Sequence, residues 1–407
     1  MDTSIGIVGA GIGGLTLALC LKHQGFTNIS LYEKYPGYSS PGAGIQLSPN
    51  ASRLLIALGL EEALSEIAFS PNAIHLRSAR SGFLLAQRPL GRFSEKRYRA
   101  PYWHLHRADL NKVLMDTVSR QGIPIHESYE LLDLKENAGQ IKLSFANGLE
   151  NVHELVMGCD GIRSSVRKCL FPNSEPQYSG HVAWRGSVRT ENLPDNHIAP
   201  TATAWMGPNK HFVHYYVRGG ELVNFLGITE EANNQSSGSF NQSSGSWRET
   251  TDQNEFAALF ADWHPSISTL IENADGIYRW PLYTSTKMPT WSSGRVTLLG
   301  DAAHATLPYL AQGAALAIED AWLLALFLER YVEEPKLAFA EYERYRKPRA
   351  ERVIAASQKQ GETFHLDNSW SIMKRNFTFI MGSRYLPEVA MQQFDWLHNY
   401  DILRGFE

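Results

Sequence analysis

The N-terminal segment that ends at Glu33 contains the pattern that most restricts how this chain can fold. An apolar run at residues 4–8 is followed at once by the sequence GAGIGG at residues 9–14, and then by an apolar helical stretch. A second apolar run at residues 28–32 ends in Glu33, about 20 residues after the glycines. Strand, glycine-rich turn, helix, strand and acid in this order predict a parallel sheet that is covered by helices and binds a dinucleotide.

The glycines of this turn have different expected tasks. Gly9 permits the tight turn after the strand, Gly11 lets the backbone approach a pyrophosphate, and Gly14 lets helix and strand pack closely. The N-terminus of the helix stabilises phosphate charge, and Glu33 can accept hydrogen bonds from ribose hydroxyls. The alternative, a glycine-rich turn that binds no ligand, fits less well with both strands and the acid in place.

The composition excludes several other classes of protein. Of 407 residues, 43% are hydrophobic and 20% charged, which is typical of a globular chain with two or three packed units. The net charge of −4 gives no reason to expect nucleic acid or an anionic membrane as partner. Three scattered cysteines argue against a disulfide framework and a zinc site. Without a signal-peptide pattern or an apolar run of roughly 18 residues, we expect a cytoplasmic protein.

Three later segments have features of a large cofactor site. Residues 41–50, PGAGIQLSPN, predict a glycine-rich extended loop that contains Gly44 and Gln46. A second permissive loop soon after the acid suggests a cofactor larger than one nucleotide, with a ring lying along the loop. Two further corners, each an apolar strand followed by a turn and a helix, contain Asp160 and Asp301 at the turn.

The middle of the chain is predicted to form a second, β-rich unit. Residues 72–100 alternate apolar and polar side chains, and residues 180–278 contain several aromatic-rich strands. At residues 211–217 a period of two places His211 and Tyr215 on one face, about 13 Å apart. The two side chains could flank an aromatic ring, or belong to a core strand with satisfied polar ends. The pattern alone favours the core strand.

The remaining segments are assigned no chemistry. The tandem heptad at residues 234–247 is polar and contains glycine, which predicts an exposed loop. Long charged helices follow, and Pro348 predicts a kink or a break within residues 336–360.

Taken together, these segments resemble the single-component FAD-dependent aromatic hydroxylases. Within them, the chain is most similar to the subgroup of salicylate hydroxylase, 3-hydroxybenzoate 6-hydroxylase and 6-hydroxynicotinate 3-monooxygenase. The resemblance covers nearly the whole chain and is specific because several motifs occur in the family's order. The motifs are the glycines at residues 9–14, GAGI at 42–45 with PN at 49–50, HRADL at 106–110, CDG at 159–161, GD at 300–301, AQGA at 311–314 and IEDA at 318–321.

The resemblance implies an α/β fold. An FAD-binding, Rossmann-like domain of the glutathione-reductase type would have an inserted β-sheet substrate domain and C-terminal helices. The FAD-binding domain would comprise residues 1–75, 100–178 and 279–360, the substrate domain residues 76–99 and 179–278, and the helical segment residues 361–407.

The resemblance also implies which residues bind the cofactors. Those assigned to FAD are Gly9, Gly11, Gly14, Glu33, Lys34, Gly44, Gln46, Arg107, Leu131, Asp160, Asp301, Gly313 and Ala314. Asp160 would serve both FAD and the NADH or NADPH that reduces it and binds transiently. Gly313 and Ala314, at a helix N-terminus, would face the flavin pyrimidine edge, where partial positive charge stabilises the anionic reduced flavin.

The implied reaction is the NAD(P)H- and O2-dependent hydroxylation of a small phenolic or hydroxy-heteroaromatic compound through a C4a-hydroperoxyflavin. A carboxylated substrate is favoured, with or without loss of CO2. His211 and Tyr215 match residues that act on the phenol in some relatives, which reverses the preference for a core strand. Pro308 matches a proline beside the flavin, and Tyr309 and Leu310 would line the substrate pocket.

The resemblance leaves the substrate open. Pro308 stands where one benzoate hydroxylase has a catalytic glutamine, and Gln46 stands where the hydroxynicotinate enzyme has a histidine. His304 is expected to support the turn after Asp301 rather than perform chemistry. The competing hypothesis is a flavin oxidoreductase without oxygen insertion, and the protein is expected to be a monomer or a homodimer without a metal site.

Overall fold

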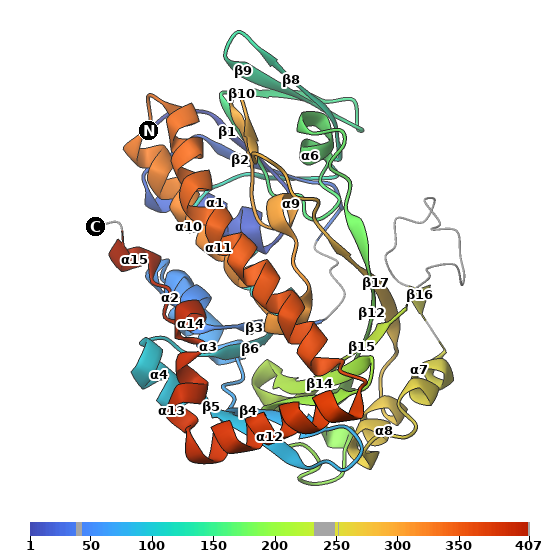
Figure 1. Ribbon diagram of the computed structural model, residues 1–407. Helices are drawn as coiled ribbons and strands as arrows, with labels where there is room; N and C mark the ends of the chain where they lie inside the picture. The colour runs from blue at the N-terminus through green and yellow to red at the C-terminus, as the bar shows by residue number, and fades with distance from the viewer. Residues whose placement is uncertain (38–42, 232–248, 251, 406–407) are drawn as a thin grey trace.

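Figure 1 shows the computed structural model, which describes residues 1–37, 43–231, 249–250 and 252–405. The tandem repeat at residues 234–247 lies outside the described residues. Two sheets occupy opposite ends of the molecule, and the long helix α11 (Pro335–Phe364) runs diagonally past both (Figure 1). Among the described helices, none combines the length and the apolar character needed to cross a membrane.

The first sheet has six strands in the order β18-β19-β11-β1-β2-β7. Their bounds are β1 (Ile5–Val8), β2 (Ile29–Glu33), β7 (Ile125–Glu127), β11 (Leu155–Gly158), β18 (Ser292–Ser293) and β19 (Val296–Leu298). Neighbours run parallel except for β18 with β19. Helices cover the sheet, which explains why its central strands are short, continuous apolar runs.

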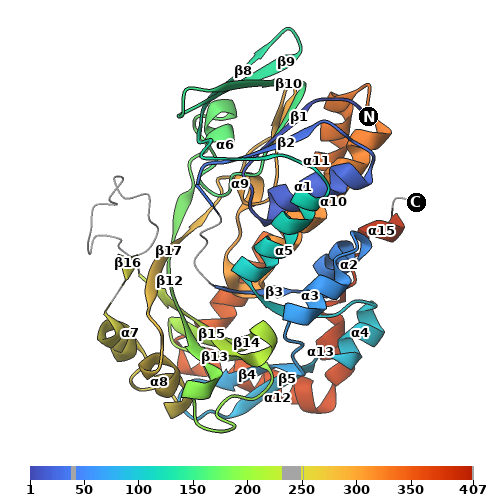
Figure 2. The same cartoon turned by 180° about the vertical axis from the view of Figure 1, so that it is seen from behind.

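Three helices pack around the first sheet, namely α1 (Ile12–His23), α5 (Arg107–Arg120) and α10 (Gly313–Arg330). They lie side by side in Figure 2, and α1 contacts both of the others. Because it has a neighbour on each side, α1 is buried along most of its length. The short helix α6 (Ser165–Leu170) follows the corner at Asp160, as predicted, and the helix expected after the corner at Asp301 is α10. A further short helix, α9 (Asp301–His304), begins at Asp301 itself.

A three-stranded antiparallel sheet extends this end of the molecule, in the order β10-β9-β8. Its strands are β8 (Leu131–Asn137), β9 (Gln140–Phe145) and β10 (Glu150–His153). Strand β8 is largely exposed and has a charged outer half.

The second sheet has eight strands in the order β16-β17-β12-β15-β14-β13-β4-β5. Their bounds are β4 (Ala73–Ser78), β5 (Leu84–Pro89), β12 (Gln177–Arg189), β13 (Ala202–Gly207), β14 (Lys210–Val217), β15 (Leu222–Glu230), β16 (Glu249–Thr250) and β17 (Tyr278–Thr284). Helices α7 (Gln253–Leu259) and α8 (Pro265–Glu272) contribute to an aromatic core with this sheet. That core includes Phe212, Phe225 and Phe256.

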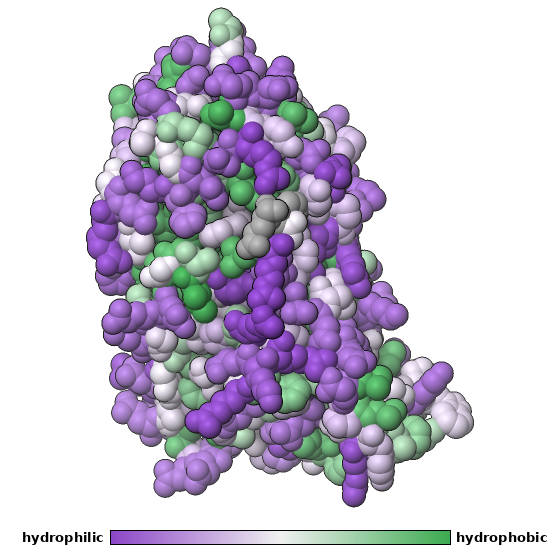
Figure 3. Space-filling view, turned by 90° about the vertical axis from the view of Figure 1, so that its left-hand side faces the viewer, coloured by the Kyte–Doolittle hydropathy of each residue, from purple (hydrophilic) through white to green (hydrophobic). Residues whose placement is uncertain are grey.

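The C-terminal region is helical. After α11 come α12 (Ser369–Tyr385), α13 (Pro387–Gln392), α14 (Asp395–His398) and α15 (Ile402–Gly405). Helix α12 lies along β5, and a backbone hydrogen bond from Gln87 to the Ser383 hydroxyl links the two elements. The surface seen in Figure 3 is mostly hydrophilic. Apolar residues form small patches on it and a larger patch at its lower right.

Three expectations about local structure were wrong. Helix α11 continues through exposed Pro348, so the predicted break does not occur there. Part of the expected loop at residues 41–50 is a strand, β3 (Gly44–Leu47), which pairs with β6 (Trp103–His106). The expected β-rich region at residues 72–100 ends in a helix, α4 (Arg92–Tyr98). The helices α2 (Pro49–Ala57) and α3 (Glu61–Ile67) lie between β3 and β4.

Candidate active site

A single cavity of about 530 Å³ extends from the glycine-rich turn of the first sheet to the inner face of the second sheet. Every residue predicted for the site lines this cavity except Gly14. The structure therefore brings together side chains from β3, β14, α5, α10 and several turns that are far apart in the sequence.

The glycine-rich turn is shaped by close backbone contacts and leaves open space beside Gly11. Gly9 has a φ of +102°, in a region that favours glycine. A Cβ atom on Gly14 would lie 2.0 Å from the carbonyl oxygen of Gly9, so Gly14 serves packing and does not reach the cavity. A Cβ atom on Gly11 would meet nothing within 4 Å, so that the backbone amides at the start of α1 are accessible to an anion.

Glu33 links the end of β2 to the same turn. Its Oε2 atom accepts a hydrogen bond from the Ala10 backbone N–H at 2.9 Å, and its Oε1 atom accepts one from the Tyr35 N–H at 3.2 Å. These bonds hold the carboxylate at the cavity wall. Lys34 is exposed at the cavity edge, and Leu131 is a buried apolar residue of its wall.

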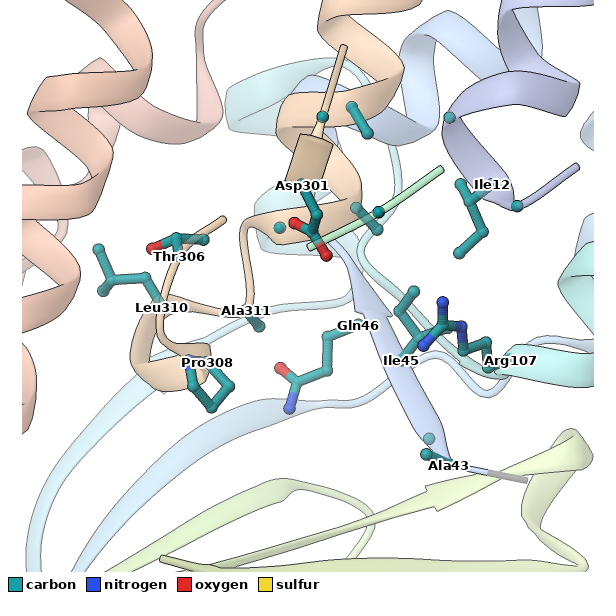
Figure 4. Close-up of a pocket in the computed structure, with 18 of the residues that line it drawn as sticks. Ile12, Ala43, Ile45, Gln46, Arg107, Asp301, Thr306, Pro308, Leu310 and Ala311 are labelled. Carbon is teal, nitrogen blue, oxygen red and sulfur yellow. The ribbon is translucent and has the colours of Figure 1, made fainter. Parts of the chain in front are cut away.

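Two acids and an arginine surround the middle of the cavity. Asp160 Oδ2 accepts a hydrogen bond from the Val166 N–H at 3.1 Å, whereas Oδ1 has no partner among the described residues. Burial raises the pKa of Asp160 and also the pKa of Asp301, although the charge of Arg107 opposes the rise at Asp301. Figure 4 shows Asp301, Arg107 and Gln46 around one open space. The Arg107 Nε–H also has no hydrogen-bond partner in the part of the chain that the structure describes.

A buried network of charges fixes the elements that carry Asp301 and Pro308. His304 Nε2 lies 2.6 Å from Asp320 Oδ2, and Asp320 Oδ1 accepts a hydrogen bond from Arg346 Nε at 2.6 Å. His304 therefore supports the turn, as expected. Asn50 donates to Gln312 at 3.0 Å and to Glu319 at 2.7 Å, which joins α2 to the N-terminus of α10.

The inner end of the cavity is aromatic and contains two half-buried cations, Arg88 and Arg185. Tyr102 donates its hydroxyl hydrogen to Gln46 Oε1 at 2.8 Å, and Tyr215 packs against His104 with ring centroids 4.6 Å apart. Burial lowers the pKa of Arg88 to about 10 and the pKa of Arg185 to about 10. Within the described part of the chain, neither arginine forms a salt bridge.

His211 and Tyr215 line this inner end from the same face of β14, together with Val213. The intervening His214 faces away and lies beside Trp205. The alternation expected from a period of two is thus observed. Burial lowers the pKa of His211 well below its usual value, and the neighbouring His365 lowers it further. Burial also raises the pKa of Tyr215.

Pro308, Tyr309 and Leu310 form a short 3-10 turn, η3 (Pro308–Leu310), on the wall between the two ends. The Tyr309 hydroxyl is buried and has no hydrogen-bond partner among the described residues. The next residue, Ala311, has a φ of +53°, which turns the chain into the N-terminus of α10. Gly313 and Ala314 then present the first turn of α10 to the cavity.

Sequence reasoning missed Arg88, Arg185 and His365. Arg185 could have been noticed as a charged residue inside the apolar strand HVAWRGSV. Arg88 lies at the end of a strand, where a charge is unremarkable, and no local signal connects His365 with His211, 154 residues away. His365, Glu230 and His181 also offer three possible metal ligands within 4.8 Å of one another.

The cavity fits a dinucleotide with an attached ring system. The turn at Gly11 can bind a pyrophosphate, Glu33 is positioned for a ribose, and the unpartnered atoms of Asp160 and Arg107 are available to polar groups between them. The helix N-terminus at Gly313 can stabilise negative charge on a ring placed beside it.

Comparisons with known proteins agree with this geometry. Residues 2–357 match the family described as FAD binding domain. The chain is 36% identical to 3-amino-4-hydroxybenzoate 2-monooxygenase PtnB3 from Streptomyces platensis, over 99% of this chain and 96% of that protein. It is 33% identical to 6-hydroxynicotinate 3-monooxygenase from Bordetella bronchiseptica, over 93% and 94% of the two chains. The crystal structure of Klebsiella pneumoniae HpxO with FAD and uric acid superposes with a TM-score of 0.81 at 23% identity, over 94% of each chain.

Proposed function

Because the chain belongs to the family of FAD-dependent aromatic monooxygenases, we propose that it hydroxylates a small aromatic carboxylate that bears a phenol or a ring hydroxyl. NADH or NADPH would supply the electrons and O2 the oxygen atom. One observation carries the proposal, namely that a single cavity joins the nucleotide turn at Gly11 to an inner end with both Arg88 and His211. FAD, when bound, would accept electrons from the nicotinamide and transfer oxygen to the ring.

Arg88 is the residue we propose for the substrate carboxylate. It lies on β5, is half-buried at the cavity wall, and stacks on the Phe394 ring with 3.7 Å between the guanidinium carbon and the ring centroid. Even partial burial of a guanidinium without a protein acid is costly, and a carboxylate can offset that cost through paired hydrogen bonds. Arg185 lies close enough to Arg107 for the like charge to lower its pKa, so it stands between the substrate end and the cofactor end of the cavity.

His211 is the residue we propose to take the proton of the ring hydroxyl. A ring oxygen that has lost its proton donates more electron density, which favours attack on electrophilic oxygen. Tyr215, held by its contacts with His104 and Gln46, would position the same hydroxyl. The carbons of Pro308, Tyr309 and Leu310 would exclude water from the reacting edge of the ring.

For the cofactor, we propose the residues inferred from the resemblance, apart from Gly14, whose proposed role is packing. Gly9, Gly11, Glu33, Lys34, Arg107 and Leu131 would hold the adenosine half, and Asp160, Asp301, Gly44, Gln46, Gly313 and Ala314 the remainder. We also retain the division into an FAD-binding domain at residues 1–75, 100–178 and 279–360 and a substrate domain at residues 76–99 and 179–278.

Aminohydroxybenzoates are the first substrates to test, since the relative at 36% identity is named for 3-amino-4-hydroxybenzoate. The purified yellow protein is mixed with NADH or NADPH and a panel of hydroxybenzoates, aminohydroxybenzoates and hydroxypyridine carboxylates, and product masses are measured. We expect a gain of one oxygen atom, and a concurrent loss of CO2 would identify decarboxylative hydroxylation. Substrate-stimulated oxygen uptake that yields only hydrogen peroxide with every compound would support the oxidoreductase alternative and contradict the proposal.

A further inference from the structure

We propose that His365 and Glu230 are positioning residues that prepare His211 to accept the substrate proton and then carry a proton to solvent. The inference rests on the proposed role of His211 and extends it to two residues outside the inner end of the cavity. The observation behind it is a continuous hydrogen-bonded chain from the cavity to the surface.

The chain has two links. His211 Nδ1 lies 2.7 Å from His365 Nε2, and His365 Nδ1 lies 2.8 Å from Glu230 Oε1. The side chains of His211 and His365 are buried, whereas the side chain of Glu230 is 43% exposed. The three residues come from β14, the end of α11 and the end of β15, so the fold brings them together from distant parts of the sequence.

The exposed carboxylate determines which nitrogen of each ring carries the proton. An ionised Glu230 can only accept, so His365 must donate from Nδ1 and keeps a lone pair on Nε2. At 2.7 Å, His211 must then donate its Nδ1–H to that lone pair. The Nε2 atom of His211 is left without a proton and can accept one from a ring hydroxyl in the cavity.

Proton transfer along this chain is balanced and involves no redox change. The ring O–H bond breaks as a proton joins His211 Nε2, while the Nδ1 proton of His211 moves to His365 Nε2. The Nδ1 proton of His365 moves to Glu230, which exchanges it with water. The chain resets when a proton returns along the same path to the hydroxylated product.

The surroundings keep both rings neutral between transfers. Burial, together with the neighbouring histidines, lowers the pKa of His211, and burial lowers the pKa of His365, although Glu230 opposes the shift at His365. Among the described residues, His181 and Tyr309 also lie against these rings, at centroid distances of 5.3 to 5.8 Å. Arg375 is turned to the backbone carbonyls of Thr363 and Phe364.

The test measures proton transfer separately from oxygenation. A nitro-substituted hydroxybenzoate, whose ionised form is yellow, is bound to the FAD-loaded enzyme, and its apparent pKa is read from absorbance. We expect Glu230→Gln and His365→Phe to raise this pKa by about one unit and to lower kcat about tenfold or more, with FAD content unchanged. The control is Glu272→Gln, which neutralises an exposed glutamate at the end of α8 and should leave both quantities near the wild-type values.

The outcomes separate this inference from the proposed function. If His211→Ala raises the bound pKa but His365→Phe and Glu230→Gln do not, the chain is overturned while the role of His211 stands. If His211→Ala also changes nothing, the proposed base itself is wrong. Loss of activity on dialysis against EDTA, with recovery on adding Zn2+, would overturn the chain as well, because a metal would then occupy the Nδ1 atom of His365.

A different observation leads to a second proposal, concerning the outer face of α12. Large apolar side chains project from this helix into solvent, with exposed fractions of 74% for Trp370, 53% for Met373, 63% for Phe377 and 38% for Met381. Their spacing follows one stripe of a helix, and such a continuous exposed stripe marks an interaction surface. Figure 3 shows apolar residues gathered at its lower right, which is the lower front of the molecule in Figure 1, where α12 lies.

We propose that this stripe pairs with the same stripe of a second copy of the chain. A two-fold axis at Phe377 would make the helices antiparallel, with Phe377 against Phe377, Met373 against Met381 and Trp370 against Arg384. In this arrangement each of these pairs would be apolar or would place an arginine next to an aromatic ring, and no two like charges would face each other in them. An aromatic side chain buries about 150–250 Å². With Tyr385, the stripe therefore supplies several hundred Å² toward the roughly 800 Å² per partner of a standard interface.

The oligomeric state decides this proposal. Sedimentation at micromolar protein should show a dimer for the wild type and a monomer for Phe377→Glu, which would place two carboxylates together on the axis. Leu132→Glu, a matched change of an exposed apolar residue on β8, should remain dimeric. A monomeric wild type would overturn the proposal, and flotation of that monomer with phosphatidylglycerol vesicles would assign the stripe to a lipid surface instead.

Discussion

Gly11 and Gly14 are three positions apart in one turn, but different physical demands require a glycine at each. A side chain on Gly14 would collide with the Gly9 carbonyl inside the fold, whereas a side chain on Gly11 would enter open space in the cavity. The fold therefore depends on Gly14, and ligand approach depends on Gly11.

Alanine substitutions should separate these two demands. We expect Gly14→Ala to destabilise the FAD-free protein by about 3 kcal/mol, because the backbone must move. Gly11→Ala should leave the unfolding temperature of the FAD-free protein near the wild-type value but weaken FAD binding at least tenfold. Thermal unfolding and flavin titration measure the two effects. Equal stability of the two FAD-free variants would contradict this assignment.

Arg88 allows a charge-specific prediction. Arg88→Met keeps most of the apolar volume but removes the cation, so the KM for a carboxylated substrate should rise about tenfold or more. The KM for an uncharged phenol should change little. Arg92→Met, at an exposed arginine of α4, is the matched control. Steady-state kinetics with a hydroxybenzoate and its amide make the comparison, and an equal loss for both compounds would count against carboxylate binding.

At the residue scale, sequence reasoning reached the residues that belong to local patterns. The alternation around His211 and the acids at the two corners were visible because each depends on neighbours within a few positions. His365 and Arg88 were not, because their significance comes from tertiary contacts. The chain from His211 to Glu230 through His365 exists only after β14, β15 and α11 have packed together.

At the scale of elements, α10 and α11 are joined by buried charges as well as apolar contacts. Arg346 pairs with Asp320 at 2.6 Å and with Glu319 at 2.7 Å, and all three side chains are fully buried. Burial alone would raise the pKa of Asp320, but the charges of His304 and Arg346 overcome it and lower the pKa to about 2. Removing one partner leaves a buried charge unpaired, which is strongly destabilising.

The lowered pKa of Asp320 determines how the stability of the folded state changes with pH. A carboxyl group with a lower pKa in the folded state contributes stability that is present above its unfolded pKa of about 4. That contribution is lost as the pH falls from about 4 through about 2. It amounts to about 2 kcal/mol, and the stability difference between wild type and Asp320→Asn should shrink over this window. Urea unfolding from pH 2 to 6 tests this, and a constant difference would contradict it.

The predicted elements were reliable where the chain had a single strong pattern. The strands and helices of the three corners follow from apolar runs bounded by turns. Helix α11 departs from the pattern because its packing against α10 outweighs the helix-breaking tendency of exposed Pro348. Strand β3 was read as a loop because its identity depends on pairing with β6, about 60 residues away.

At the scale of the whole molecule, the cavity has one wall on each large sheet. Gly11 and Glu33 belong to the six-stranded sheet and its turns, while His211 and Tyr215 belong to the eight-stranded sheet. Local patterns predicted two units, and the resemblance supplied their arrangement. A ligand that spans the cavity should consequently couple the stability of the two sheets.

Ligands of different length test this coupling. FAD should raise the unfolding temperature increasingly with concentration, since binding to the folded state contributes about 2.7 kcal/mol at 100 times Kd and about 1.4 kcal/mol for each further tenfold excess. ADP reaches only the nucleotide end and riboflavin only the ring end, so neither bridges the sheets. At equal saturation, the protein with FAD should therefore unfold in one sharp calorimetric transition. The temperature of this transition should be higher than that of the protein with ADP and riboflavin added together. If ADP alone reproduces the full effect of FAD, the stability of the eight-stranded sheet does not depend on the ligand.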